Sequence, residues 1–167
     1  MILTIWRHGE AGSAATDRQR QLTDRGRDDI GYGCHHFHEH CLARSIPIPG
    51  LIAYSEWRRT TETADIIAGL FSHARCEREP ALIPGSRVEQ VDAALEQELA
   101  SASCPQHILL VSHQPLVSRL VDYYLGEPGL VAPLSPGGLA CLQMEVPGAA
   151  CASLLFSAQP PQYECNS

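Results

Sequence analysis

Short apolar runs recur along the chain, separated by longer stretches in which apolar residues return every three or four positions. Runs of this length are typical of buried β-strands, which predicts strands over 1–6, 51–54 and 108–112. Two further runs, 139–145 and 151–157, predict strands late in the chain. The predicted strands are therefore spread along the whole chain and are not confined to one region.

Helical spacing fills the intervals between these strands. Apolar positions three or four apart predict helices over 24–44, 58–72 and 88–100, and Pro115 suits the first turn of a fourth helix. Thr23 is a residue type that caps helices, so it marks the start of the first one. Strands that alternate with helices predict an α/β fold, a three-layer sandwich in which helices flank a largely parallel central sheet.

The 167 residues are enough for one domain, which we place at 1–158, with 159–167 as a loose C-terminal tail. No apolar stretch is long enough to span a membrane, and the net charge of −7 argues against a nucleic-acid partner. The chain enters its first strand without a signal-like segment, and its seven cysteines are interpreted as reduced thiols. We therefore expect a cytoplasmic protein. The sequence leaves its oligomeric state open, although a monomer is compatible with it.

Two of the predicted strands end in a histidine. Arg7, His8, Gly9 and Glu10 follow the first strand, and His113 follows a later one. A glycine lets the backbone turn sharply, which leaves the preceding side chains at the carboxyl end of the strand. Open α/β sheets bind ligands at that edge, so we expect the two histidines to meet there.

The chemistry that suits such a pair is phosphoryl transfer without a metal. A neutral His8 attacks phosphorus through one ring nitrogen, provided that an acceptor such as the Gly9 carbonyl holds the proton on the other. Charge spreads over the oxygens of the transferring group, and arginine binds such oxygens through two N–H groups at once. Arg7, Arg20 and Arg59 lie near the predicted strand ends and are the candidate donors.

Four segments, in this order, resemble the histidine phosphatase superfamily, whose fold is called phosphoglycerate mutase-like. They are Arg-His-Gly at 7–9, Arg before Leu-Thr at 20–23, Ser-x-x-x-Arg-x-x-x-Thr at 55–63 and Ser-His at 112–113. The short length and the residues after His113 look most like the SixA-type phosphohistidine phosphatase branch.

The resemblance implies a role for each matched residue. His8 becomes phosphorylated, and no metal or other cofactor takes part. The catalytic set implied is Arg7, His8, Arg59 and His113, and the substrate-binding residues implied are Gly9 and Arg20.

Larger members of the superfamily carry an inserted cap with a glutamate that acts as general acid, and this chain has no large cap insertion. Glu10 and Glu89 are the candidate acids here, and Glu56 replaces a common proline at the rim of the pocket. Phosphohistidine has a good leaving group, and an uncapped pocket admits a side chain on a protein surface. We therefore expect a metal-independent phosphatase whose substrate is a histidine-phosphorylated protein domain and whose product is phosphate.

Two other functions stay open on the sequence. One is a small-molecule phosphomonoesterase, in which Glu10 or Glu89 protonates the leaving group, and the other is a phosphate-binding module without turnover. A separate cluster at 34–41 contains four histidines and two cysteines. This cluster is a polar helix face or a transition-metal site, and no spaced set of partner ligands favours the metal.

Overall fold

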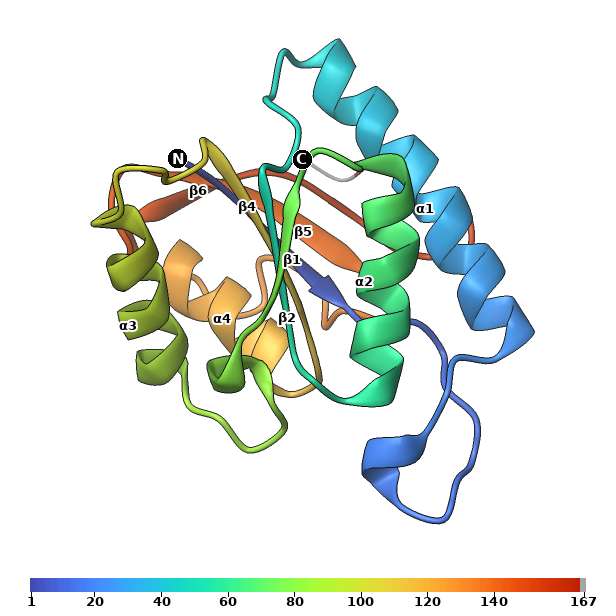
Figure 1. Ribbon diagram of the computed structural model, residues 1–167. Helices are drawn as coiled ribbons and strands as arrows, with labels where there is room; N and C mark the ends of the chain where they lie inside the picture. The colour runs from blue at the N-terminus through green and yellow to red at the C-terminus, as the bar shows by residue number, and fades with distance from the viewer. Residues whose placement is uncertain (166–167) are drawn as a thin grey trace.

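The computed structural model describes residues 1–165, and in it helices cover both faces of a six-stranded mixed sheet (Figure 1). The strands are β1 (Ile2–Arg7), β2 (Leu51–Tyr54), β3 (Arg75–Arg78), β4 (His107–Ser112), β5 (Leu139–Met144) and β6 (Ala152–Ala158). The helices are α1 (Asp24–Ala43), α2 (Arg58–Leu70), α3 (Val88–Leu99) and α4 (Leu116–Leu125), with short 3-10 turns η1 (Asp17–Gln19) and η2 (Pro80–Leu82). The predicted three-layer α/β fold is confirmed.

The sheet has the order β3-β2-β4-β1-β5-β6, which places β1 and β4 at its centre. The pairs β1–β4, β2–β4 and β2–β3 are parallel, whereas β5 pairs antiparallel with both β1 and β6. Central parallel strands are covered on both faces, so they require apolar residues at successive positions. That requirement explains the unbroken apolar runs in β1 and β4.

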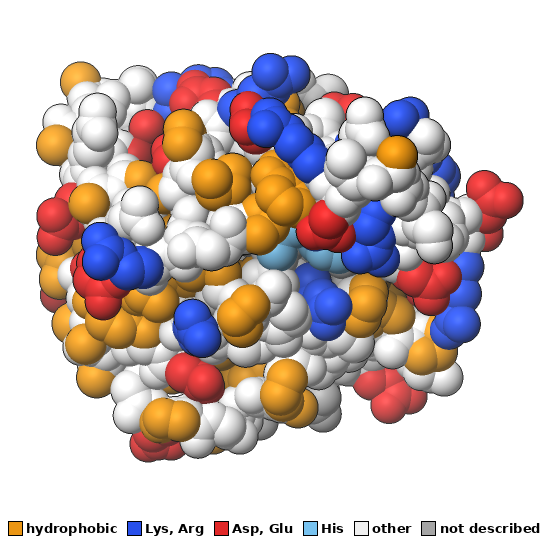
Figure 2. Space-filling model, turned by 90° about the horizontal axis from the view of Figure 1, so that it is seen from below, with side chains coloured by type: hydrophobic (Ala, Val, Ile, Leu, Met, Phe, Trp, Pro, Cys, Tyr) orange, Lys and Arg blue, Asp and Glu red, His pale blue; other side chains and the backbone are white. Residues whose placement is uncertain are grey.

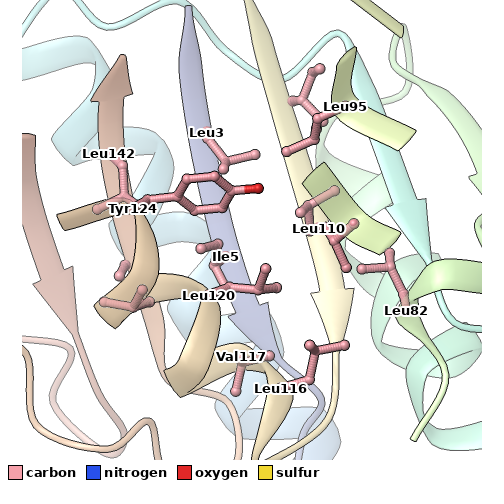
Figure 3. Packing of buried hydrophobic residues seen from close by; sticks show 14 of the residues in the cluster. Leu3, Ile5, Leu82, Leu95, Leu110, Leu116, Val117, Leu120, Tyr124 and Leu142 are labelled. Atoms are coloured by element: carbon pink, nitrogen blue, oxygen red, sulfur yellow. The ribbon is translucent and has the colours of Figure 1, made fainter. Parts of the chain in front are cut away.

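Alternate residues of β1 enter two separate cores. Leu3 and Ile5 pack with α3 and α4 on one face of the sheet, and Trp6 packs with α1 and α2 on the other. The two-residue period of a strand produces this division. Figure 3 shows the first core, in which Leu120 and Tyr124 of α4 pack against the sheet.

The first helix begins as the sequence predicts. The Thr23 hydroxyl accepts a hydrogen bond from the Gly26 amide at 2.9 Å, which is the N-cap interaction. Position 33 of this helix needs a glycine, because the ring of Tyr163 packs directly on the helix there. A Cβ atom at position 33 would lie 2.4 Å from that ring.

Two segments differ from the predictions. Strand β3 is not among the predicted strands, because an exposed edge strand has no apolar pattern to reveal it. The predicted loose tail is wrong for residues 159–165. Tyr163 is 1% exposed and its hydroxyl donates to the Gly137 carbonyl, while the Gln159 side chain accepts from the Ser135 amide. Residues 166–167 lie outside the described part of the chain.

No helix within residues 1–165 is long and apolar enough to cross a membrane.

Candidate active site

An open cleft of about 340 Å³ lies at the carboxyl edge of the sheet, where β1 and β4 end. In Figure 2, which looks onto this edge, histidine side chains lie at the bottom of a hollow with basic side chains beside them. The residues that line the cleft are Arg7, His8, Glu10, Ala11, Asp17, Arg20, Arg59, Pro84, His113, Gln114 and Pro136. The structure therefore brings together the two predicted histidines and all three predicted arginines.

His8 is held as one defined tautomer. Its Nδ1–H donates to the Gly9 carbonyl at 2.8 Å, and its Nε2 accepts a hydrogen bond from Arg59 Nε at 3.0 Å. A carbonyl only accepts, so the ring proton is on Nδ1 and the lone pair is on Nε2. Nε2 is therefore the unprotonated ring nitrogen, which is the form that a nucleophilic histidine requires.

Gly9 holds the ring of His8 through its backbone carbonyl. Its carbonyl accepts from His8, its amide donates to Thr63 Oγ1 at 3.1 Å, and it does not line the cleft. A Cβ atom at Gly9 would lie 3.0 Å from the Gly26 carbonyl oxygen of α1, so the loop packs closely against that helix. Gly9 therefore contacts His8 and Thr63 through its backbone, and its predicted role in binding substrate stays a prediction.

Arg59 and Arg20 both bind Asp17. Arg59 donates to the Asp17 carbonyl at 2.7 Å and to its carboxylate at 3.2 Å, while Arg20 Nη1 donates to the same carboxylate at 3.1 Å. The other Arg20 nitrogens donate to the Ala11 and Gly12 carbonyls. Asp17 therefore engages the two guanidinium groups that an incoming phosphoryl group would use.

The remaining cationic donor comes from the end of β1. Arg7 Nη1 donates to the Leu134 carbonyl at 2.8 Å, and its buried Nε has no hydrogen-bond partner in residues 1–165. His113 lies at the end of β4, with its ring centroid 5.1 Å from that of His8. Its Nε2 lies 2.9 Å from Ser55 Oγ.

The three carboxylates singled out from the sequence lie in different places. Glu10 lines the cleft and accepts a hydrogen bond from the Thr23 hydroxyl at 2.9 Å. Glu89 is exposed on the first turn of α3 and does not line the cleft, so the structure does not bring it to the site. Glu56 is exposed and pairs with Arg18 at 2.5 Å outside the cleft.

Burial keeps both site histidines neutral. Desolvation, together with the nearby charge of Arg59, lowers the pKa of His8 to about 4, against the hydrogen bond to Gly9, which raises it. Desolvation, followed by the charges of His8 and Arg59, lowers the pKa of His113 to about 3. Neutral imidazole is the form in which His8 has a free lone pair, so the site supports nucleophilic attack at neutral pH.

Three site residues have roles that sequence reasoning did not assign. Ser55 and Thr63 belong to the Ser-x-x-x-Arg-x-x-x-Thr segment, and they contact His113 and Gly9 respectively. Asp17 lies in a polar loop that carries no recognisable pattern. The motif contains Ser55 and Thr63 but does not reveal their contacts, and the position of Asp17 depends on how the loop folds.

The histidine-rich cluster of α1 lies outside the cleft. Residues 1–165 contain no group of three or more His, Cys, Asp or Glu side chains placed to hold a metal ion. A second cleft of about 370 Å³ lies beside α3, and neither histidine nor cysteine lines it. The chemistry of the described residues is therefore concentrated at the carboxyl edge of the sheet.

Solved structures share this architecture. The protein histidine phosphatase SixA in complex with tungstate superposes with a TM-score of 0.75 at 25% identity, over 96% of this chain and 97% of that one. A SixA protein from Agrobacterium tumefaciens gives 0.74 at 21% identity, over 96% and 98% of the two chains. A mycobacterial glucosyl-3-phosphoglycerate phosphatase gives 0.68 at 15% identity, over 92% and 97%. No protein-family model matches the sequence, and neither does any curated protein sequence.

The chain has the fold of the histidine phosphatase superfamily, and a neutral histidine among arginines lies at the carboxyl edge of its sheet. Together they indicate a hydrolase of phosphoryl groups. Two SixA structures superpose on the chain over about 96% of its length, which confirms the resemblance predicted from its four motifs.

Proposed function

We propose that this protein hydrolyses phosphohistidine on a protein domain through a covalent phosphohistidine at His8. One observation carries the proposal. His8 presents an unprotonated Nε2 between the guanidinium groups of Arg7, Arg20 and Arg59, with its proton held on Nδ1 by a backbone carbonyl. That arrangement supplies a nucleophile and the charge that stabilises a transferring phosphoryl group.

The reaction proceeds in two steps. In the first step, His8 Nε2 forms a bond to phosphorus while the bond from phosphorus to the substrate nitrogen breaks, and the leaving imidazole keeps its proton. Arg59 donates to His8 Nε2 at 3.0 Å in this structure, so its guanidinium turns to the phosphoryl oxygens as phosphorus approaches. In the second step, water attacks phosphorus and releases phosphate and neutral His8.

The form of the cleft supports a protein substrate. The segment between β3 and α3 (residues 79–87) is short, and no large insertion covers the cleft. A side chain on the surface of another protein therefore reaches His8 without a lid having to open. One relative of similar fold is itself described as a protein histidine phosphatase, which supports the same choice of substrate.

The test is release of phosphate from a histidine-phosphorylated phosphotransfer domain in the presence of EDTA. Wild type is expected to turn over, and His8→Ala is expected to lose turnover completely because the nucleophile is gone. His36→Ala, a change on α1 outside the cleft, serves as the matched control and is expected to behave as wild type. Absence of turnover by wild type, with phosphate bound in the cleft, would instead indicate a binding module.

Glu10 supports a second candidate function, a small-molecule phosphomonoesterase, because its carboxylate lines the cleft. A small-molecule phosphate ester has a poor leaving group, which needs a proton from such an acid. Under the proposed function, Glu10→Gln has little effect on the phosphorylated domain and a larger effect on p-nitrophenyl phosphate. Efficient ester hydrolysis by wild type that depends on Glu10, with poor turnover of the domain, would favour a phosphomonoesterase.

A further inference from the structure

Ser55 contacts His113, which lines the cleft. It is fully buried, immediately after β2, and its Oγ lies 2.9 Å from His113 Nε2. The same oxygen accepts a hydrogen bond from the Trp57 amide at 3.4 Å. The hydroxyl therefore links the end of β2 to the histidine at the end of β4.

The hydrogen bonds of this hydroxyl determine where the His113 proton is. A buried hydroxyl hydrogen needs an acceptor, and His113 Nε2 is the one available to Ser55 within residues 1–165. If Ser55 donates to Nε2, that nitrogen is unprotonated, and the neutral ring carries its proton on Nδ1. The Nδ1 atom is buried and has no hydrogen-bond partner in the described chain.

We infer that Ser55 is a positioning residue that holds His113 as the neutral Nδ1–H tautomer, so that its one ring proton is free to bind a phosphoryl oxygen in the cleft. The inference rests on the proposed function for the identity of that oxygen. It assigns His113 the part of a neutral hydrogen-bond donor, and the positive charge of the site comes from the arginines.

The charges around His113 favour the same form. The titratable groups that face it are His8, Arg59, Arg7 and Asp17. His8 is neutral, the two arginines disfavour a positive imidazolium, and Asp17 favours it. Burial contributes most and lowers the pKa of His113 to about 3. An imidazolium would also direct Nε2–H at Ser55 Oγ and leave the hydroxyl hydrogen without an acceptor, which is costly in a buried site.

The first test needs no substrate and no variant of Ser55. Two-bond nitrogen–proton NMR spectra of protein with labelled histidine distinguish the Nδ1–H tautomer, the Nε2–H tautomer and the imidazolium, and His113→Asn identifies the His113 signal. The expected result is an Nδ1–H pattern at about pH 7 that persists to about pH 5. An Nε2–H or doubly protonated His113 at neutral pH would overturn the inference, whatever the activity of the enzyme.

The second test compares two buried serines beside the same strand end. Ser55→Ala is expected to abolish the pure Nδ1–H pattern and to lower kcat/KM for the phosphorylated domain by roughly 10-fold, as for one lost hydrogen bond. Ser112→Ala also removes a buried hydroxyl, which donates to the Leu82 carbonyl at 2.7 Å, and is expected to leave the His113 pattern unchanged. An unchanged pattern in Ser55→Ala would refute the role of the hydroxyl. If that variant does not fold, the wild-type spectrum still decides.

Discussion

His107 is expected to make the protein sensitive to acid, far from the active site. This histidine opens β4 and is completely buried, with Nδ1–H donating to the Pro47 carbonyl at 2.6 Å and Nε2 accepting from the Thr4 hydroxyl at 2.8 Å. Desolvation lowers its pKa to about 4. The folded ring is therefore neutral over a pH range in which the unfolded ring takes up a proton.

The sign and size of the effect follow from proton linkage. Above about pH 6.5 neither state binds the proton, and the stability that the neutral ring contributes is fully present. Between about pH 6.5 and pH 4 the unfolded state binds more protons, so the free energy of unfolding falls as the pH falls. A pKa of about 4 in place of 6.5 corresponds to a total loss of roughly 3 kcal/mol, with a slope near pH 5 of about 1.2 kcal/mol per pH unit.

Urea unfolding at several pH values between about 7 and 4.5 measures this slope. His107→Asn removes the titrating ring, and it is expected to be less stable at neutral pH by about 2 kcal/mol because Thr4 loses its acceptor. The free energy of unfolding of this variant should nevertheless fall less steeply than that of wild type as the pH falls. The two slopes should differ by about 1 kcal/mol per pH unit. His36→Asn on α1 is the control. Equal slopes for wild type and His107→Asn would refute the reasoning.

Three further predictions concern other parts of the molecule. Gly33→Ala should lower the free energy of unfolding by about 1–3 kcal/mol, because the new Cβ meets the Tyr163 ring. Gly31 has open space around it, so Gly31→Ala should raise the free energy of unfolding by up to about 1 kcal/mol in the same urea assay. Asp17→Asn should lower the Kd for tungstate, measured by calorimetry, by roughly 2- to 5-fold, because the Asp17 carboxylate competes with the anion for Arg59. Weaker binding of tungstate by the variant would contradict this prediction. Arg59→Ala should lower kcat/KM for phosphate release by roughly 100- to 1000-fold, and a change below 10-fold would exclude it as a main donor.

The sequence predicts most of this fold because its central strands are buried on both faces. An apolar run such as that of β4 is unambiguous, and so is the spacing of α4, whose buried residues lie on one side. Strand β3 is different. All four of its residues are exposed at the sheet edge, so backbone pairing with β2 fixes it and no side-chain pattern reveals it.

The site is predictable as a set of residues but not as a set of contacts. The positions of His8, Arg59 and His113 follow from where the strands end, because all three lie at one edge of one sheet. The contact of Asp17 with Arg59 depends on how a polar loop folds back, and no local pattern encodes it. The packing of Tyr163 on Gly33 depends on a tertiary contact between residues that are distant in sequence.

The central position of β1 has a consequence for how the chain folds during synthesis. Ile2 pairs with His107 on one side and with Gln143 on the other, so β1 gains both neighbours only after more than a hundred further residues have been made. Contacts so distant in sequence slow folding, and the apolar strand meanwhile stays open to misassociation. The strand that leads to His8 therefore has no partner in the sheet until β4 has been made.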